Sequence, residues 1–278
     1  MPTFAAPEPI TASVTTAGAR VRVAASERSD TVVLVEPVNS ASKSDVKVAE
    51  NTKVDFTGGA LSIKTTKSGD KNGSVAITIE LPVGSRLVLN TAWTDVEVEG
   101  LLGDCELNIA SGQVQLDHIA GLKAELAAGS VQVGHIAGTA TIGGGAAAVR
   151  IGEATGVVRY QGSTGKVWIG HALSDIDLSG SSGSFDIDRA DGSVTVKAGD
   201  CPIRIGRMTR GQAELANASG GIEIGISEGA AATVDAKSTK GAVRNSLPTQ
   251  DNLGEFTDKV TVHARTRLDD IVIHRAAA

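Results

Sequence analysis

The segment 158–190 reads VRYQGSTGKVWIGHALSDIDLSGSSGSFDIDRA and holds two consecutive copies of one pattern. In the first copy Val158 and Tyr160 alternate with polar residues, and a turn around Gly165 leads to a second alternating pair. The pattern then starts again with Ile176 and Leu178. Alternation with a period of two indicates a strand that buries one face. The segment therefore predicts a unit of two short strands joined by a turn.

The same unit can be followed along the chain in both directions. Its second pair recurs at a nearly constant step of about 18 residues, at Val114/Leu116, Val131/Val133, Val149/Ile151, Val167/Ile169, Phe185/Ile187, Ile203/Ile205 and Ile222/Ile224. A steady period of this length is typical of stacked coils. A meander of hairpins is the alternative, but hairpin loops tolerate changes of length and would not hold the period. We therefore expect an all-β fold, a β-solenoid (β-helix) of about ten coils of ~18 residues that stack into one column.

Two columns of turn residues accompany the strands. A glycine recurs between the two strands of a coil, at Gly112, Gly129, Gly145, Gly165, Gly183 and Gly220. Glycine or aspartate recurs after the second strand, at Asp117, Gly134, Gly152, Gly170, Asp188, Gly206 and Gly225. Because both residue types tolerate left-handed backbone geometry, the sequence predicts a repeated left-handed turn in each column.

The repeats fill residues 86–247, and the two ends of the chain depart from them. Residues 1–85 contain alternating runs and a hairpin signal at Thr57-Gly58-Gly59-Ala60, which predict a β-rich N-terminal cap continuous with the coils. Within the cap, the polar segment 39–51 fits either a short helix or a loop. Residues 248–278 predict a polar loop and a C-terminal closing rung.

Composition excludes several classes of function. The chain has 33 glycines and only 3% aromatic residues, which suits a narrow interior rather than a thick core. Its net charge of -6 argues against nucleic acid as a partner, because phosphate binding needs a basic face. No apolar run is long enough for a membrane helix and the N-terminus lacks a signal-peptide pattern, so we expect no membrane insertion and a cytoplasmic location. Cys105 and Cys201 would lie several coils apart, so we expect free thiols.

The repeats, together with three further segments, resemble a bacterial β-strand-repeat family of unknown function labelled "putative adhesin". The segments are MPTFAAPEPI at the start, ITIELPVGSRL over 77–87 and VTVHARTRLDDIVIHR over 260–275. The likeness is close to the actinobacterial type. The resemblance covers essentially the whole chain and implies a β-solenoid without an established activity, while the adhesin label implies a surface role.

Stacking turns positions that are one coil apart into spatial neighbours, so candidate sites are sought by column. One turn column reads His118, His135, Glu153, His171, Arg189 and Arg207. Its first three members could bind zinc, but the change to arginine within two coils favours an exposed turn column without a metal. We therefore predict no metal site and no cofactor.

The outward column of the second strand contains the candidate contact residue. It reads Gln115, Gln132, Arg150, Trp168, Asp186, Arg204 and Glu223, which is mostly a ladder of alternating charges. Trp168 is the exception, because an exposed indole is unusual in a chain so poor in aromatics. Trp168 could contact a partner or ligand together with Arg150 or Arg159, or it could simply pack on Arg150.

No clustered carboxylates, Ser-His-Asp set or phosphate loop accompany these columns. The sequence therefore favours a non-catalytic scaffold that presents flat solenoid faces to an unknown protein partner or to itself. The alternative function is an enzyme that acts on a glycan or a small molecule on a β-helix.

Overall fold

The computed structural model describes residues 2–65, 73–248 and 257–276. The chain divides into two compact units, Met1–Ala137 and Gly138–Ala278. Apart from one short helix the described elements are strands, so the fold is all-β and solenoid-like, as the repeat predicts.

The first unit begins with short strands and ends with long ones that run through more than one coil. Its elements are β1 (Thr3–Ala5), β2 (Thr11–Ala17), β3 (Ala19–Ser26), β4 (Asp30–Pro37), α1 (Lys43–Asn51), β5 (Lys53–Thr57), β6 (Ala60–Lys64), β7 (Val75–Pro82), β8 (Arg86–Ala92), β9 (Asp95–Ile109) and β10 (Gln113–Ile136). The helix resolves the choice left open for the polar segment 39–51. The hairpin expected at residues 57–60 is confirmed, because β5 and β6 pair antiparallel around it.

Vertical stacking in this unit follows the predicted period. The start of β10 pairs in parallel with β9, with Val114 opposite Val96 and Leu116 opposite Val98. Further along β10, Ser130 N donates to the carbonyl of Gly112 and Ala137 N donates to that of Ile119. Each of these bonds joins positions that are one period of the repeat apart.

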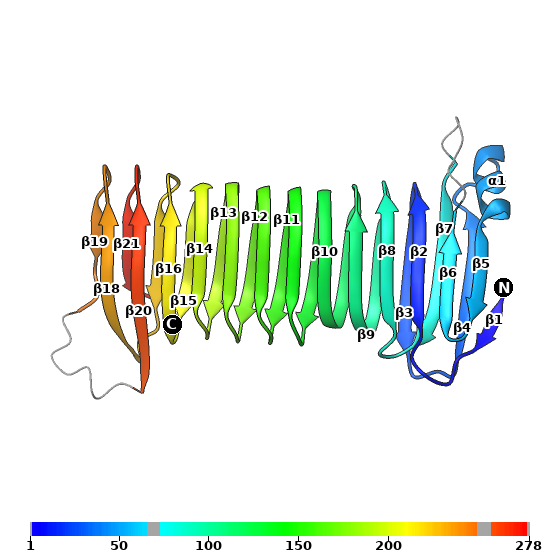
Figure 1. Cartoon of the computed structure of the whole chain (residues 1–278), viewed down its shortest axis with the longest axis horizontal. Helices are drawn as coiled ribbons and strands as arrows, with labels where there is room; N and C mark the ends of the chain where they lie inside the picture. Colours follow the sequence, from blue (N-terminus) through cyan, green and yellow to red (C-terminus); the bar gives the residue numbers. More distant parts are fainter. Residues whose placement is uncertain (1, 66–72, 249–256, 277–278) are drawn as a thin grey trace. The chain divides into compact units, whose positions relative to one another are not determined.

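The N-terminal strands lie inside the stack rather than at its end. β2 pairs in parallel with both β6 and β8, and β3 pairs in parallel with both β7 and β9 (Figure 1). Two coils that follow each other in sequence are thus separated in space by the first coil of the chain. Two buried hydroxyls hold this arrangement: Ser85 Oγ accepts from Ile10 N at 3.0 Å, and Thr94 Oγ1 accepts from Ala19 N at 3.4 Å.

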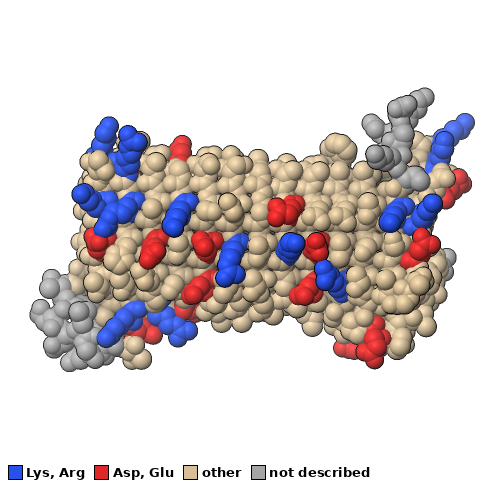
Figure 2. Space-filling model, viewed as in Figure 1, with Lys and Arg blue, Asp and Glu red and all other residues tan. Residues whose placement is uncertain are grey.

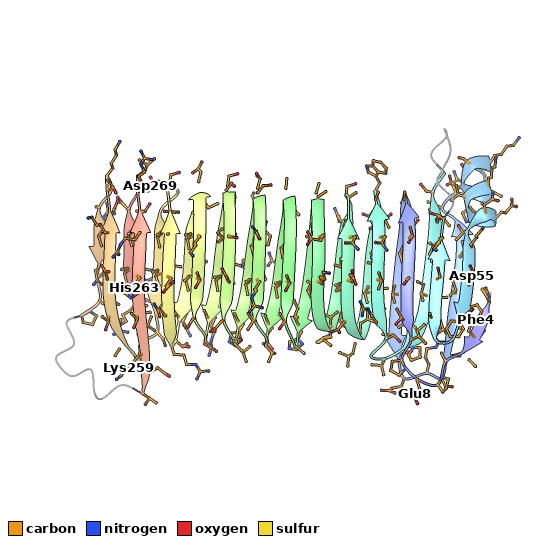
Figure 3. The ribbon with its side chains drawn as sticks, in the orientation of Figure 1. Phe4, Glu8, Asp55, Lys259, His263 and Asp269 are labelled. Atoms are coloured by element: carbon orange, nitrogen blue, oxygen red, sulfur yellow. The ribbon has the colours of Figure 1, made fainter. Side chains whose placement is uncertain are left out.

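Antiparallel strands close the outer side of these coils. β4 pairs antiparallel with β7, β1 pairs antiparallel with β4, and β5 lies antiparallel to β6. The rings of Phe4 on β1 and Phe56 on β5 stack with centroids 4.9 Å apart (Figure 3, where Phe4 and the neighbouring Asp55 are labelled). Helix α1 packs against β4 and β7, and Ser42 caps its N-terminus.

The second unit carries the most regular repeats. Its strands are β11 (Ala140–Ala154), β12 (Val158–Ala172), β13 (Ile176–Ala190), β14 (Val194–Asp200), β15 (Ile203–Met208), β16 (Gly211–Asn217), β17 (Ile222–Ile226), β18 (Ala230–Ser238), β19 (Val243–Asn245), β20 (Asp258–Thr266) and β21 (Ile271–Arg275). In β12 and β13 the two expected strands form one continuous element, because the residues of the turn also pair, Gly162 with Gly180 and Gly165 with Gly183.

Each coil has a first strand segment, which in β12 carries Val158 and Tyr160, and a second strand segment, which carries Val167 and Ile169. The interior lies between these two segments. The inward side chains Val158, Tyr160, Val167 and Ile169 of β12 are all buried. The Tyr160 ring in a first segment meets the Phe185 ring in a second segment edge-on, with centroids 6.0 Å apart. The two segments therefore face each other across a narrow apolar layer, and their outward side chains point to opposite faces.

The C-terminal strands repeat the insertion seen at the N-terminus. β20 pairs in parallel with both β16 and β18, and β21 pairs with both β17 and β19 (Figure 1). The turn between β20 and β21 bonds to both flanking coils, since Asp269 accepts from Gly220 N and Asp270 accepts from Ala242 N. Asp269 is labelled at this turn in Figure 3. Apart from Pro248, the expected polar loop over 248–255 lies outside the described residues.

The first turn column has the expected positive φ at four of its six glycines, Gly112, Gly129, Gly183 and Gly220, but not at Gly145 or Gly165, and the second column has it at none of its residues. Gly183 has φ +129°, and a Cβ there would lie 1.8 Å from the carbonyl oxygen of Gly165. In the second column Gly170 and Gly206 have no positive φ, so the expected left-handed turn is wrong there. Glycine serves close approach instead: a Cβ on Gly170 would lie 2.6 Å from the carbonyl oxygen of Gly152.

Both cysteines are free thiols, as expected, and both are buried. Burial, and then the charge of Asp104, raises the pKa of Cys105 to about 12. None of the helices in the described part of the chain is long and apolar enough to cross a membrane.

Candidate binding face

The outward column that contains Trp168 lies in register on the second segments of the second unit. Arg150 pairs with Trp168, Trp168 with Asp186, and Asp186 with Arg204, which in turn pairs with Glu223. We call these five residues the Trp168 face. The predicted column is therefore a real line of neighbouring side chains.

Arg150 and Trp168 form a stacked pair. The guanidinium carbon of Arg150 lies 3.8 Å from the centre of the Trp168 ring. Trp168 lies along its own strand, since a Cβ on Gly170 would come within 2.9 Å of the far edge of the indole. The bare backbone at Gly170 thus makes room for the ring, while part of the indole stays exposed.

Beyond Trp168 the face is a ladder of ion pairs. Arg204 donates to Asp186 at 2.8 Å and approaches Asp188 at 3.5 Å. The hydrogen bond to Asp186 is the main reason why the pKa of Arg204 is raised. Glu223 lies 3.2 Å from His274 Nε2. Figure 2 shows acidic and basic side chains interspersed in this way over the visible surface, with wide uncharged regions between them.

Arg159 does not join this group. It lies in the first segment of β12, opposite Thr141 of β11 and Asp177 of β13. Because the first and second segments face each other across the interior, Arg159 and Trp168 point to opposite faces. The structure brings Arg150 and Trp168 together and leaves Arg159 apart.

A polar cluster at the second turn column was not predicted. His171 Nε2 lies 2.8 Å from Asp191, which also accepts two hydrogen bonds from Arg189 and one from Thr209. Burial alone would raise the pKa of Asp191, but the hydrogen bonds from Arg189, His171 and Thr209 outweigh it and lower the pKa to about 2. Sequence reasoning missed Asp191 because the matching positions in neighbouring coils, Leu173 and Thr209, are not acidic.

The second unit has a charged groove at its surface. A groove of about 370 Å³ runs beside the ladder and is lined by Asp188, Arg189, Arg204, Gly206, Arg207, Glu223 and His274. Its charged groups pair with opposite charges in or beside the groove, as Arg204 does with Asp186, Arg189 with Asp191 and His274 with Glu223. Such mutual pairing suits a stable surface better than a reacting centre.

The residues considered for zinc are divided between the two units. In the first unit the rings of His118 and His135 have centroids 5.7 Å apart, and His118 lies 2.8 Å from Asp117. Over residues 2–65, 73–248 and 257–276, no three His, Cys, Asp or Glu side chains gather as metal ligands. Glu153 instead neighbours His171 in the second unit, at 3.6 Å.

Trp93 is a second exposed indole that sequence reasoning overlooked. It lies between β8 and β9 in the first unit, is 76% exposed and has φ 49°. Its position in a turn, outside the outward columns of the strands, kept it from being singled out.

Comparison with known proteins finds a family whose model matches most of the chain. The profile described as Toastrack DUF4097 matches residues 11–273. No curated protein matches the chain. Three similar solved structures are described as "putative adhesin". One is from Parabacteroides distasonis, with 12% identity and a TM-score of 0.37, covering 98% of this chain and 95% of that one. One from Bacteroides fragilis has 12% identity, a TM-score of 0.36 and the same coverage. One from Parabacteroides merdae has 8% identity and a TM-score of 0.38, covering 98% and 94%.

Proposed function

We propose that this chain, which belongs to the Toastrack DUF4097 family, is a non-catalytic scaffold that binds a protein partner through the Trp168 face. The observation that carries the proposal is the Arg150–Trp168 stack, which places a partly exposed indole on a flat, regularly spaced surface. Tryptophan and arginine are the residues that most often supply binding energy at protein interfaces. The ion pairs along the ladder supply charges of both signs that fix the orientation of a partner.

The proposal is tested by capture of partners from cells of the source organism. The intact chain is compared with Trp168→Ala and with Arg159→Ala, which removes a large exposed side chain from the opposite face. We expect a bound protein that is retained by Arg159→Ala and lost by Trp168→Ala. Equal capture by all three chains would show that the Trp168 face is not the contact surface.

The proposal includes the organisation and location of the protein. We propose a solenoid of about ten coils of roughly 18 residues, with a β-rich cap over 1–85, the repeats over 86–247, and a polar loop and C-terminal closing rung over 248–278. Limited proteolysis tests these boundaries, because cleavage concentrates in exposed connections.

We also propose that the protein belongs to the actinobacterial type and works in the cytoplasm. Free buried thiols at Cys105 and Cys201 are usual in a reducing compartment, and fractionation of source cells tests this location.

A further inference from the structure

The outermost coil of the second unit leaves its apolar interior partly open. Val234 of β18 is paired with Val262 of β20, which is fully buried, but Val234 itself is partly exposed. Val243 of β19 is 42% exposed, whereas its partner Ile271 on β21 is fully buried. The side chains that face inward in this coil are therefore covered on one side only.

The backbone of the same coil is also unpartnered on its outer side. In the part of the chain that the structure describes, β18 pairs with β20 alone and β19 pairs with β21 alone. An unpaired edge offers N–H and C=O groups to a further strand. The coil thus presents two open sheet edges with an apolar opening between them.

The outer strands of the first unit are built differently from this open coil. Its outer strands β1, β4 and β5 pair antiparallel with their neighbours, and helix α1 packs against β4. The stacked rings of Phe4 and Phe56 join β1 to β5. A head-to-tail array would therefore have to join two unlike ends. The surface that does match the open end is the same end of a second copy.

The charges along β18 are self-complementary in one antiparallel register. Asp235 and Lys237 both point outward and are exposed. When two β18 strands pair antiparallel about Ala236, Asp235 of each copy lies opposite Lys237 of the other. Asp235 is already held in position, since Arg265 lies 2.5 Å and His263 lies 3.5 Å from its carboxylate. Opposite charges that face each other across strands stabilise the pairing.

We propose that two copies of this chain associate through the outer edges of β18 and β19 in a closed, two-fold dimer. This goes beyond the proposed function, since it names a surface at which the chain binds a second copy of itself and the number of copies. Because the contact is the same on both copies, it closes after two and does not grow.

The mass of the intact protein in solution tests the dimer. We expect the average molecular mass measured by sedimentation equilibrium to rise with concentration from 28.2 kDa to twice that value and no further. Lys237→Glu would set a second carboxylate against Asp235 in both reciprocal contacts, so we expect dimerisation to weaken by about tenfold. Lys197→Glu is the matched control, because Lys197 is exposed on β14 between two paired strands and its replacement makes the same change of charge.

Hydrogen exchange locates the contact independently of any variant. We expect the amides of residues 232–238 to exchange more slowly at high protein concentration than at low concentration. Protection of these amides that does not depend on concentration would mean that the chain's own residues cover the edge, and would overturn the proposal. A monomer at every concentration, a mass that grows beyond two copies, or an equal effect of both lysine variants would also overturn it. Partner capture through Trp168 is measured separately, so failure of the dimer and failure of the binding face can be told apart.

Discussion

Replacing Gly183 by alanine tests whether successive coils lie directly on one another. Gly183 combines two demands: its φ is +129°, and a Cβ would lie 1.8 Å from the carbonyl oxygen of Gly165 in the preceding coil. Three other glycines separate these demands. Gly58 has φ +57° with nothing within 4 Å, Gly199 lacks a positive φ but would place its Cβ 2.4 Å from Ser181 O, and Gly229 has neither constraint.

The expected losses of stability follow from this separation. Alanine at Gly58 incurs only the strain of left-handed backbone, about 1–2 kcal/mol. Alanine at Gly199 forces a shift of the neighbouring strand, which costs about 1–3 kcal/mol. Gly183→Ala combines both effects, and its φ lies where only glycine is common, so we expect a loss of about 2–6 kcal/mol. Gly229→Ala should stay within about 0.5 kcal/mol of the parent.

Chemical denaturation followed by circular dichroism measures the four variants against the parent. The order of stability loss should be Gly183, then Gly199 and Gly58, then Gly229. Hydrogen exchange at residues 160–190 checks that the loss is local to the coils in contact. If Gly183→Ala were as mild as Gly229→Ala, Gly183 would not lie against Gly165, and the vertical register would be refuted.

Three further predictions follow from buried or paired groups. Tyr160→Phe removes a buried hydroxyl without a hydrogen-bond partner among the described residues, so we expect it to stabilise the protein by about 1 kcal/mol, measured by denaturation; a clear loss of stability would reveal a partner for the hydroxyl. Asp191→Asn should destabilise the protein by about 1–2 kcal/mol at pH 7, and because the pKa of Asp191 is lowered, this difference should shrink as the pH falls from about 5 toward 2 in denaturation curves. A difference that persists at pH 2 would contradict that pairing. Cys105, whose pKa burial raises to about 12, should resist a thiol reagent at pH 8 until the protein is denatured, and rapid labelling of the native protein would contradict its burial.

The regular coils could be predicted from sequence because their information is local and repeated. Val158, Val167 and Ile176 each sit where alternation and the constant repeat step place them, and the parallel pairings confirm this register. The same step of 18 residues predicted that Arg150 and Trp168 are neighbours in one column. Arg159 could be assigned to the opposite face only once the first and second segments were seen to enclose the interior between them.

The ends could not be predicted in the same way because their pairing is not local. Nothing in the alternation of β2 distinguishes a place between β6 and β8 from a place at the outer edge. Neighbours in sequence usually become neighbours in space, and both terminal coils break that tendency. The left-handed turn predicted for the second turn column was wrong for a different reason. Glycine is needed at Gly170 because the backbone of the preceding coil and the Trp168 ring lie close to it, and not because the backbone makes a left-handed turn.

The placement of β20 and β21 between two earlier coils has a consequence for synthesis on the ribosome. Residues 211–245 emerge first, yet β16 and β18 acquire their shared neighbour only when β20 has been made. A nascent chain halted before residue 258 would leave these strands without the partner that separates them, and direct pairing of β16 with β18 would set a non-native register. Synthesis through β21 is thus a condition for correct folding of this part of the unit. The N-terminal coil is made first and can instead serve as the template on which both of its neighbours assemble.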